Sequence, residues 1–177
     1  MNSTLREFFK IGICCILPLA FFINCSEPEN IDIHLSLSEF EDQLLTHEGN
    51  NTSTSELDGK YLGIYFSSYY CPPCRDFTPK LVEFREKHAD EFEVVFVSSD
   101  FEEDDQFNYI KEANMKFLTL PIDSNVSFHL SEKLGVDGIP SVAIVSPTGK
   151  VLTLKGTDHI SDNSENALSD WKSLSQK

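Results

Sequence analysis

Cysteine is scarce over most of the sequence. Three of its five cysteines, Cys14, Cys15 and Cys25, lie near the start, so Cys71 and Cys74 are the two that remain in the rest of the chain. One pair cannot form the framework of several disulfides that stabilises small secreted domains. Because there is no second pair and no histidine suitably placed beside the first, a tetrahedral zinc site is not expected, and we predict no bound metal.

Basic residues are also scarce. Lys and Arg together number 14 against 29 Asp and Glu, which gives a formal net charge of −15. Nucleic-acid binding needs Lys and Arg side chains to replace the counterions of the phosphates, so we expect no nucleic-acid partner. The chain has 177 residues, 40% of them hydrophobic, and this is enough for one domain with a substantial core.

No apolar run has the length of a typical transmembrane helix. Residues 11–23 form a run of about a dozen residues, which is the length found in signal peptides, and Arg6 and Lys10 precede it. Polar residues follow directly after Cys25. This ending resembles a bacterial lipobox, in which the cysteine is lipidated and becomes the new N-terminus, although Asn24 replaces the usual Gly, Ala or Ser. An uncleaved anchor and an ordinary secretory signal are the alternatives.

We therefore expect three parts in the chain. Residues 1–24 form a signal peptide of the lipoprotein type, residues 25–30 form a short tether, and residues 31–177 form the domain. The domain is exported under each of the three alternatives. The preferred location is the bacterial cell envelope on its periplasmic side, with the domain held at the membrane by a lipid on Cys25.

The remaining cysteines belong to the sequence Cys71-Pro72-Pro73-Cys74, which stands where a strand gives way to a helix. An apolar, β-rich run precedes it and a helical pattern over residues 78–88 follows. A thiol at a helix N-terminus faces unpaired N–H groups and the positive end of the helix dipole, and both favour the thiolate. We predict that Cys71 is the nucleophile and that Cys74, one turn further on, closes a disulfide with it. Pro72 is tolerated early in a helix because its missing N–H is not needed there.

The rest of the pattern indicates an α/β fold. Strands are expected at residues 61–66 and 93–98, and a helix between two parallel strands implies a right-handed crossover. Later in the chain, we expect a hairpin of residues 142–145 and 151–154 and a last helix from about residue 161. Near the start, the alternation of residues 31–35 predicts a half-buried strand, and Ser36 or Ser38 is expected to cap a helix through about Thr46.

These elements and several motifs resemble the thioredoxin fold, and the tryparedoxin and nucleoredoxin branch of it in particular. The resemblance covers roughly residues 58–156. It rests on Tyr65-Phe66-Ser67, Cys71-Pro72-Pro73-Cys74-Arg75, Phe77-Thr78-Pro79, Val97-Ser98-Ser99-Asp100, Leu120-Pro121 and Gly138-Ile139-Pro140-Ser141. Membrane-anchored bacterial thiol reductases are similar in fold and in the expected location.

The resemblance implies a central mixed sheet flanked by helices on both faces. It also implies that Pro140 is cis and lies against the cysteine pair, where the Ile139 backbone would hydrogen-bond an extended substrate segment. Tyr70, Pro72 and Pro73 would complete the substrate-binding surface. No cofactor is implied beyond the redox-active disulfide of the two cysteines.

Two positions depart from the pattern of the family. Tyr70 stands where a Trp usually precedes the first cysteine. Tyr65 stands where thioredoxins proper carry a buried Asp, as it does in the tryparedoxin branch, so the group that accepts the proton of Cys74 is open. Asp76 and Asp100 are the candidates for that role.

The function we expect is that of an exported, lipid-anchored thiol:disulfide oxidoreductase that works as a reductase. Its partners would be protein disulfides or thiols as substrates and an upstream thiol electron donor. One alternative is a copper-binding or copper-delivering lipoprotein with the same fold, for which His129 and His159 are available, although that family has three residues between its cysteines and this chain has two. A non-catalytic binding module is a further alternative that the two intact cysteines disfavour.

Overall fold

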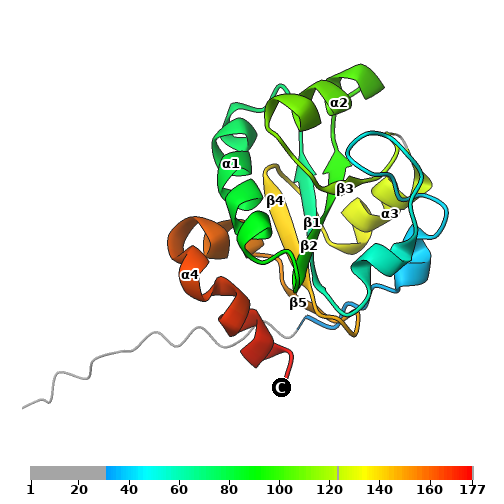
Figure 1. Ribbon diagram of the computed structural model, residues 1–177. Helices are drawn as coiled ribbons and strands as arrows, with labels where there is room; N and C mark the ends of the chain where they lie inside the picture. Colours follow the sequence, from blue (N-terminus) through cyan, green and yellow to red (C-terminus); the bar gives the residue numbers. More distant parts are fainter. Residues whose placement is uncertain (1–30, 123, 177) are drawn as a thin grey trace, which may run out of the picture.

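The computed structural model describes residues 31–122 and 124–176, which form a central sheet with helices on both faces (Figure 1). The predicted signal peptide of residues 1–24, the tether of residues 25–30 and Cys25 within it lie outside the described residues. Among the residues that are described, no helix is long and apolar enough to cross a membrane.

The sheet has five strands in the order β3-β2-β1-β4-β5. β1 pairs in parallel with β2, and β2 pairs in parallel with β3, whereas β4 runs antiparallel to both β1 and β5. The strands are β1 (Tyr61–Ser67), β2 (Phe92–Ser98), β3 (Leu118–Thr119), β4 (Ser141–Val145) and β5 (Val151–Thr153). This is the mixed sheet of the thioredoxin fold, so the predicted fold class is confirmed.

Successive side chains of a strand point to opposite faces of the sheet, and both faces are covered. Tyr65 packs in the core on the face of α1 (Pro72–Lys87), α2 (Glu103–Glu112) and α4 (Gly156–Leu174). Its neighbours Ile64 and Phe66 pack on the other face, with α3 (Asn125–Lys133) and the 3₁₀ turns η1 (Leu37–Phe40) and η2 (Thr54–Leu57). Figure 1 shows α1 and α4 on one side of the sheet and α3 on the other.

The aromatic centre of the larger core joins three elements. Trp171 of α4 is fully buried, and its ring lies 5.4 Å from that of Phe84 in α1 and 5.5 Å from that of Phe92 in β2. Buried aromatic side chains contribute a large apolar area each. This contact holds the last helix of the chain against the helix that begins at the cysteines.

The start of the domain differs from the prediction. Residues 31–35 form no strand, and their pairing with the hairpin is limited to one isolated bridge between His34 and Lys150 and to hydrogen bonds at Leu35 and Val151. β5 has three residues and therefore offers little edge to pair with. The predicted helix after Ser36 is also wrong, because η1 ends at Phe40.

The helix after Ser36 ends at Phe40 because the backbone of the residues that follow is paired with another part of the fold. Asp42 has a φ of 60°, and Leu45 exchanges hydrogen bonds of 2.9 Å with Thr119 of β3 in both directions. Phe40 at the end of η1 and Leu44 in the irregular segment after it are both buried.

One helix begins where the cysteine motif predicted and another begins earlier than expected. α1 starts at Pro72, directly after Cys71, since proline is well accepted in a first turn. α4 starts at Gly156 rather than near residue 161, and a Cβ at that glycine would lie 2.7 Å from the backbone oxygen of Val142. The absence of a side chain therefore lets α4 begin directly against β4.

Candidate active site

The two cysteines lie at the junction between β1 and α1, as predicted. Cys71 is the N-cap of α1, and its sulfur accepts a hydrogen bond of 3.3 Å from the backbone N–H of Cys74. The two residues form a disulfide with a Cα–Cα distance of 5.2 Å. Cys71 is partly exposed, whereas Cys74 is fully buried. The sulfur that an incoming substrate can reach therefore belongs to Cys71.

The loop before β4 forms the second wall of the site. Because Ser141 pairs with Phe66, the start of β4 lies beside the end of β1, from which the chain leads to Cys71. The Ile139–Pro140 peptide bond is cis, as the resemblance implied, and the Ile139 oxygen lies 3.9 Å from the Cys71 sulfur. Sheet register thus brings together two motifs that lie far apart in the chain.

The predicted substrate-binding residues of α1 and the loop before it lie at the surface. Pro72 and Pro73 are exposed, and Tyr70 has 69% of its surface accessible. The Tyr70 hydroxyl donates a hydrogen bond of 3.0 Å to Asp105, and this bond to a carboxylate raises the pKa of the phenol. Asp105 lies in the first turn of α2, where an acidic side chain also complements the helix dipole.

Tyr69 and Arg75 make further contacts with α2. The Tyr69 hydroxyl donates to Glu112 over 2.9 Å, and the Arg75 guanidinium pairs with the same carboxylate over 3.3 Å. The Arg75 side chain also lies over the Tyr69 ring, 5.0 Å from its centre. These exposed contacts connect both sides of the cysteine motif to α2.

A cluster of buried hydroxyl groups lies beneath Cys74. The Thr78 hydroxyl donates to the Cys74 backbone oxygen over 2.8 Å, and it lies 2.7 Å from the Tyr65 hydroxyl and 2.5 Å from the Tyr109 hydroxyl. Ser67 continues the cluster at 3.3 Å from Tyr109. Burial raises the pKa of Tyr65, so this group remains a neutral phenol.

The sequence alone did not identify Thr78 and Tyr109 as neighbours of the site. The spacing of four residues between Cys74 and Thr78 was available as a signal, because a threonine hydroxyl in a helix can bond the carbonyl four residues earlier. Tyr109 carried no such local signal, since α2 brings it to Thr78 only in the folded chain.

The two candidate proton acceptors lie in different surroundings. Asp76 is exposed on α1, whereas Asp100 is buried just after β2. The carboxylate of Asp100 accepts hydrogen bonds from Ser68, Tyr69 and Ser98. Its oxygens are therefore engaged with the loop that precedes Cys71.

The described residues contain no group of three or more His, Cys, Asp or Glu side chains that could hold a metal ion. Of the two histidines considered for copper, His159 accepts a hydrogen bond of 3.0 Å from the indole N–H of Trp171 through its Nδ1 atom. His129 lies on α3, where its ring contacts that of Phe128. These contacts give no support to the copper alternative.

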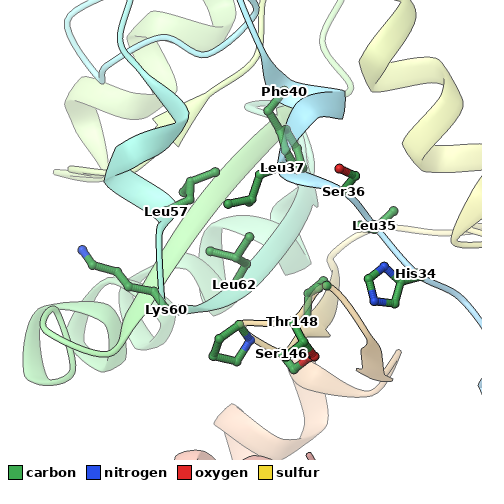
Figure 2. Close-up of a pocket in the computed structure, with 13 residues that line it drawn as sticks. His34, Leu35, Ser36, Leu37, Phe40, Leu57, Lys60, Leu62, Ser146 and Thr148 are labelled. Carbon is green, nitrogen blue, oxygen red and sulfur yellow. The ribbon is translucent and has the colours of Figure 1, made fainter.

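A separate pocket of about 310 Å³ lies at the other end of β1, away from the cysteines (Figure 2). Leu37, Leu57 and Leu62 form part of its apolar lining, and Ser146 and Thr148 of the turn between β4 and β5 contribute polar atoms. None of the predicted site residues lines this pocket.

Comparison with known proteins agrees with this geometry. A family model described as Thioredoxin-like matches residues 59–151. The chain is 38% identical to nucleoredoxin of Mus musculus over 117 residues, which cover 64% of this chain and 26% of that protein. It thus spans about a quarter of the length of the nucleoredoxins that it matches.

Tryparedoxins match over most of their length. The chain is 38% identical to tryparedoxin of Trypanosoma brucei brucei over 132 residues, which cover 72% of this chain and 90% of that protein. A solved structure of tryparedoxin II complexed with glutathionylspermidine superposes with a TM-score of 0.66 at 30% identity and covers 73% of this chain and 92% of that one.

The buried hydroxyl cluster leads to a prediction about stability. Replacing Thr78 with Val should lower the free energy of unfolding by about 1–3 kcal/mol, because it removes the buried hydrogen bonds of the Thr78 hydroxyl to Tyr65 and Tyr109. Urea unfolding of the disulfide form measures the change.

Thr157→Val is the matched control, since the Thr157 hydroxyl is buried without a hydrogen-bond partner in the described part of the chain. This substitution should leave stability unchanged or slightly increased. Equal losses for the two variants would contradict a stabilising role for the cluster.

Proposed function

This chain belongs to the thioredoxin-like family, and on that basis we propose that it is a thiol:disulfide oxidoreductase that works through Cys71 and Cys74. The observation that carries the proposal is the placement of the cysteine pair. The accessible sulfur caps α1 and accepts the N–H of Cys74, and the buried sulfur is one turn away in disulfide contact. A family member with this geometry has both a nucleophile and a resolving thiol.

The reaction proceeds by two thiol–disulfide exchanges. The thiolate of Cys71 attacks one sulfur of the substrate disulfide, which forms a mixed disulfide and releases the other sulfur as a thiolate that takes up a proton. Cys74 then loses its proton and attacks the Cys71 sulfur, which releases the second substrate sulfur as a thiolate and leaves the Cys71–Cys74 disulfide. The released thiolate takes up a proton. The substrate gains two electrons and two protons in all; the cysteine pair supplies both electrons and the proton of Cys74, and the other proton comes from water, to which Cys71 lost its own when the thiolate formed.

The disulfide form must be reduced again before the next turnover. We propose a thiol compound or a dithiol protein as the electron donor, which returns two electrons and two protons to the pair by the reverse exchange. The solved complex of tryparedoxin II with glutathionylspermidine supports this choice, because a glutathionyl group carries a thiol. Reduction of substrate, rather than oxidation, is the direction that the relationship to tryparedoxins favours.

Several features support Cys71 as the attacking group. Its sulfur accepts the backbone N–H of Cys74, which is the first N–H of α1 because Pro72 and Pro73 carry none, and this donor stabilises a thiolate together with the helix dipole. Cys74 is fully buried and lies above a cluster of neutral hydroxyls, so a substrate cannot reach it first. The different exposure of the two sulfurs therefore assigns their order of reaction.

The substrate segment is proposed to bind between α1 and the loop before β4. The Ile139 oxygen lies beside the Cys71 sulfur and can accept a backbone N–H of an extended segment, with Pro140 behind it. Tyr70, Pro72 and Pro73 are exposed around the sulfur and offer apolar surface to the residues next to the substrate disulfide.

We propose that the domain is exported and attached to a membrane. The basic residues, the short apolar run and Cys25 at the start of the chain support export and lipid attachment at Cys25. The domain would then work at the periplasmic side of a bacterial membrane, on substrates that reach that surface.

Substitution of the two cysteines tests the mechanism. With dithiothreitol as donor and a peptide disulfide as substrate, Cys71→Ser should abolish turnover because the buried Cys74 is the one thiol left in the pair. Cys74→Ser, reduced and then freed of dithiothreitol before the peptide is added, should form a persistent mixed disulfide with the peptide, seen as an added mass on the intact protein, because no second thiol of the pair resolves it.

Cys25→Ser is the matched control, because it is the same substitution outside the proposed reaction, and it should keep the turnover of the unaltered chain. Full activity of Cys71→Ser, or a trapped adduct on Cys74 of that variant, would contradict the proposed order of attack.

Lipid attachment has its own test. When the full chain is expressed in a bacterium, the unaltered protein should sediment with membranes and incorporate radiolabelled palmitate, and Cys25→Ala should lose the label. Cys14→Ala is the control and should retain it. A chain that lacks label but keeps its redox activity would refute the anchor and leave the enzyme assignment intact.

A further inference from the structure

We propose that Asp100 is a positioning residue for Cys71. It holds the loop of residues 68–70 in the shape that sets the nucleophile on the end of α1. This inference rests on the proposed function, since it assigns a role within that reaction.

Asp100 lies where two parallel strands end side by side. Ser67, the last residue of β1, pairs with Ser98, the last residue of β2, and the N–H of Ser99 donates to the Ser67 oxygen over 2.8 Å. Asp100 follows directly and has 7% of its surface exposed. A carboxylate buried to this extent needs several donors to compensate for the loss of water.

The donors come from the loop that leads to Cys71. The Ser68 hydroxyl donates over 2.5 Å to Oδ1, and the Tyr69 backbone N–H donates to Oδ1 and Oδ2 over 2.9 and 3.2 Å. The Asp100 carboxylate also accepts a hydrogen bond of 2.8 Å from the hydroxyl of Ser98 in β2. The backbone N–H of Asp100 donates to the same hydroxyl over 3.0 Å. The carboxylate therefore joins the ends of two neighbouring strands.

Hydrogen bonds within the loop connect Ser68 to Cys71, the proposed nucleophile. The Cys71 N–H donates to the Ser68 backbone oxygen over 3.2 Å, and the Tyr70 N–H donates to the Ser68 hydroxyl over 3.3 Å. Ser68 is thus bonded both to Asp100 and to the turn that ends at Cys71. Loss of the carboxylate would free this turn and let the Cys71 sulfur move away from the N–H of Cys74.

Other contacts of the loop are weaker anchors. Tyr69 and Tyr70 reach Glu112 and Asp105 of α2 through exposed hydrogen bonds. Water competes for such contacts, and their net contributions are small. The carboxylate of Asp100 is buried, so water cannot take its place as the acceptor for Ser68 and Tyr69.

A carboxamide can distinguish positioning from a role of the charge. Asn at this position keeps one acceptor oxygen for Ser68 and Tyr69, and its NH₂ group can donate to the Ser98 hydroxyl. Asp100→Asn therefore preserves most of the geometry without the charge. Asp100→Ala removes both the acceptor oxygens that hold the loop and the charge.

The test measures the reactivity of Cys71 in the reduced full chain. The rate of alkylation by iodoacetamide is followed from pH 5 to 10, and peptide mass spectrometry reports the adduct on Cys71 apart from the other cysteines. The variants are Asp100→Ala, Asp100→Asn, Ser68→Ala and Glu112→Gln. The last removes an exposed anchor of the same loop and serves as the matched control.

Asp100→Ala should raise the midpoint of the Cys71 titration by about one pH unit and slow alkylation about tenfold at pH values below that midpoint. Ser68→Ala should shift the midpoint in the same direction by a smaller amount. Asp100→Asn and Glu112→Gln should stay within about twofold of the unaltered chain. Circular dichroism confirms that each variant is folded.

Three outcomes would overturn the proposal. An unchanged midpoint in folded Asp100→Ala would show that the loop does not depend on the carboxylate. A loss in Asp100→Asn as large as in Asp100→Ala would assign the effect to charge. If Asp100→Ala does not fold, Ser68→Ala decides, and an unchanged midpoint there would also reject the proposal.

Turnover of a peptide disulfide distinguishes a failure of the proposed function from a failure of the role proposed for Asp100. If the proposed function is wrong, the unaltered chain would not turn over a peptide disulfide, whatever the ratios of Cys71 reactivity among the variants. Normal turnover combined with any of the three outcomes above would instead reject the role of Asp100 alone.

Discussion

The hydrogen bond from the backbone N–H of Cys74 to the sulfur of Cys71 is the interaction on which the proposed chemistry depends. It makes Cys71 the N-cap of α1 and aims the accessible sulfur at the positive end of the helix dipole. The same geometry keeps the second sulfur one turn away and buried. This arrangement favours a thiolate at Cys71 and places the resolving thiol of Cys74 next to it.

The surrounding structure keeps this short motif in place from several sides. Below it, the hydroxyl of Thr78 ties the Cys74 carbonyl to the buried Tyr65 and Tyr109. Beside it, the pairing of β4 with β1 brings the Ile139 oxygen to the Cys71 sulfur. In front of it, Asp100 binds the loop that leads from β1. Each of these supports comes from a different element of the fold, and all of them meet where the parallel strands end.

Much of this arrangement could be predicted because its signals are local. The Cys71-Pro72-Pro73-Cys74 motif, the buried strands and the Ile139-Pro140 pair each occupy adjacent residues, and the cis peptide bond and the mixed sheet agree with the resemblance. Predictions failed where distant pairing overrides local pattern. Leu45 is bonded to Thr119 instead of continuing a helix, and residues 31–35 are joined to the hairpin only by an isolated bridge at His34 and by hydrogen bonds at Leu35 and Val151. The role of Asp100 depends on bonds across 31 or 32 residues, which no local pattern reports.

The reduction potential of the Cys71–Cys74 pair decides whether the pair works as a reductant, because a dithiol that reduces its substrates must give up electrons readily. The measurement equilibrates the protein with dithiothreitol or glutathione buffers and quantifies the two forms by mass after alkylation. We expect a value near that of thioredoxin, about −270 mV. A value near about −120 mV, that of a strong periplasmic oxidant, would contradict it and assign the pair to disulfide formation.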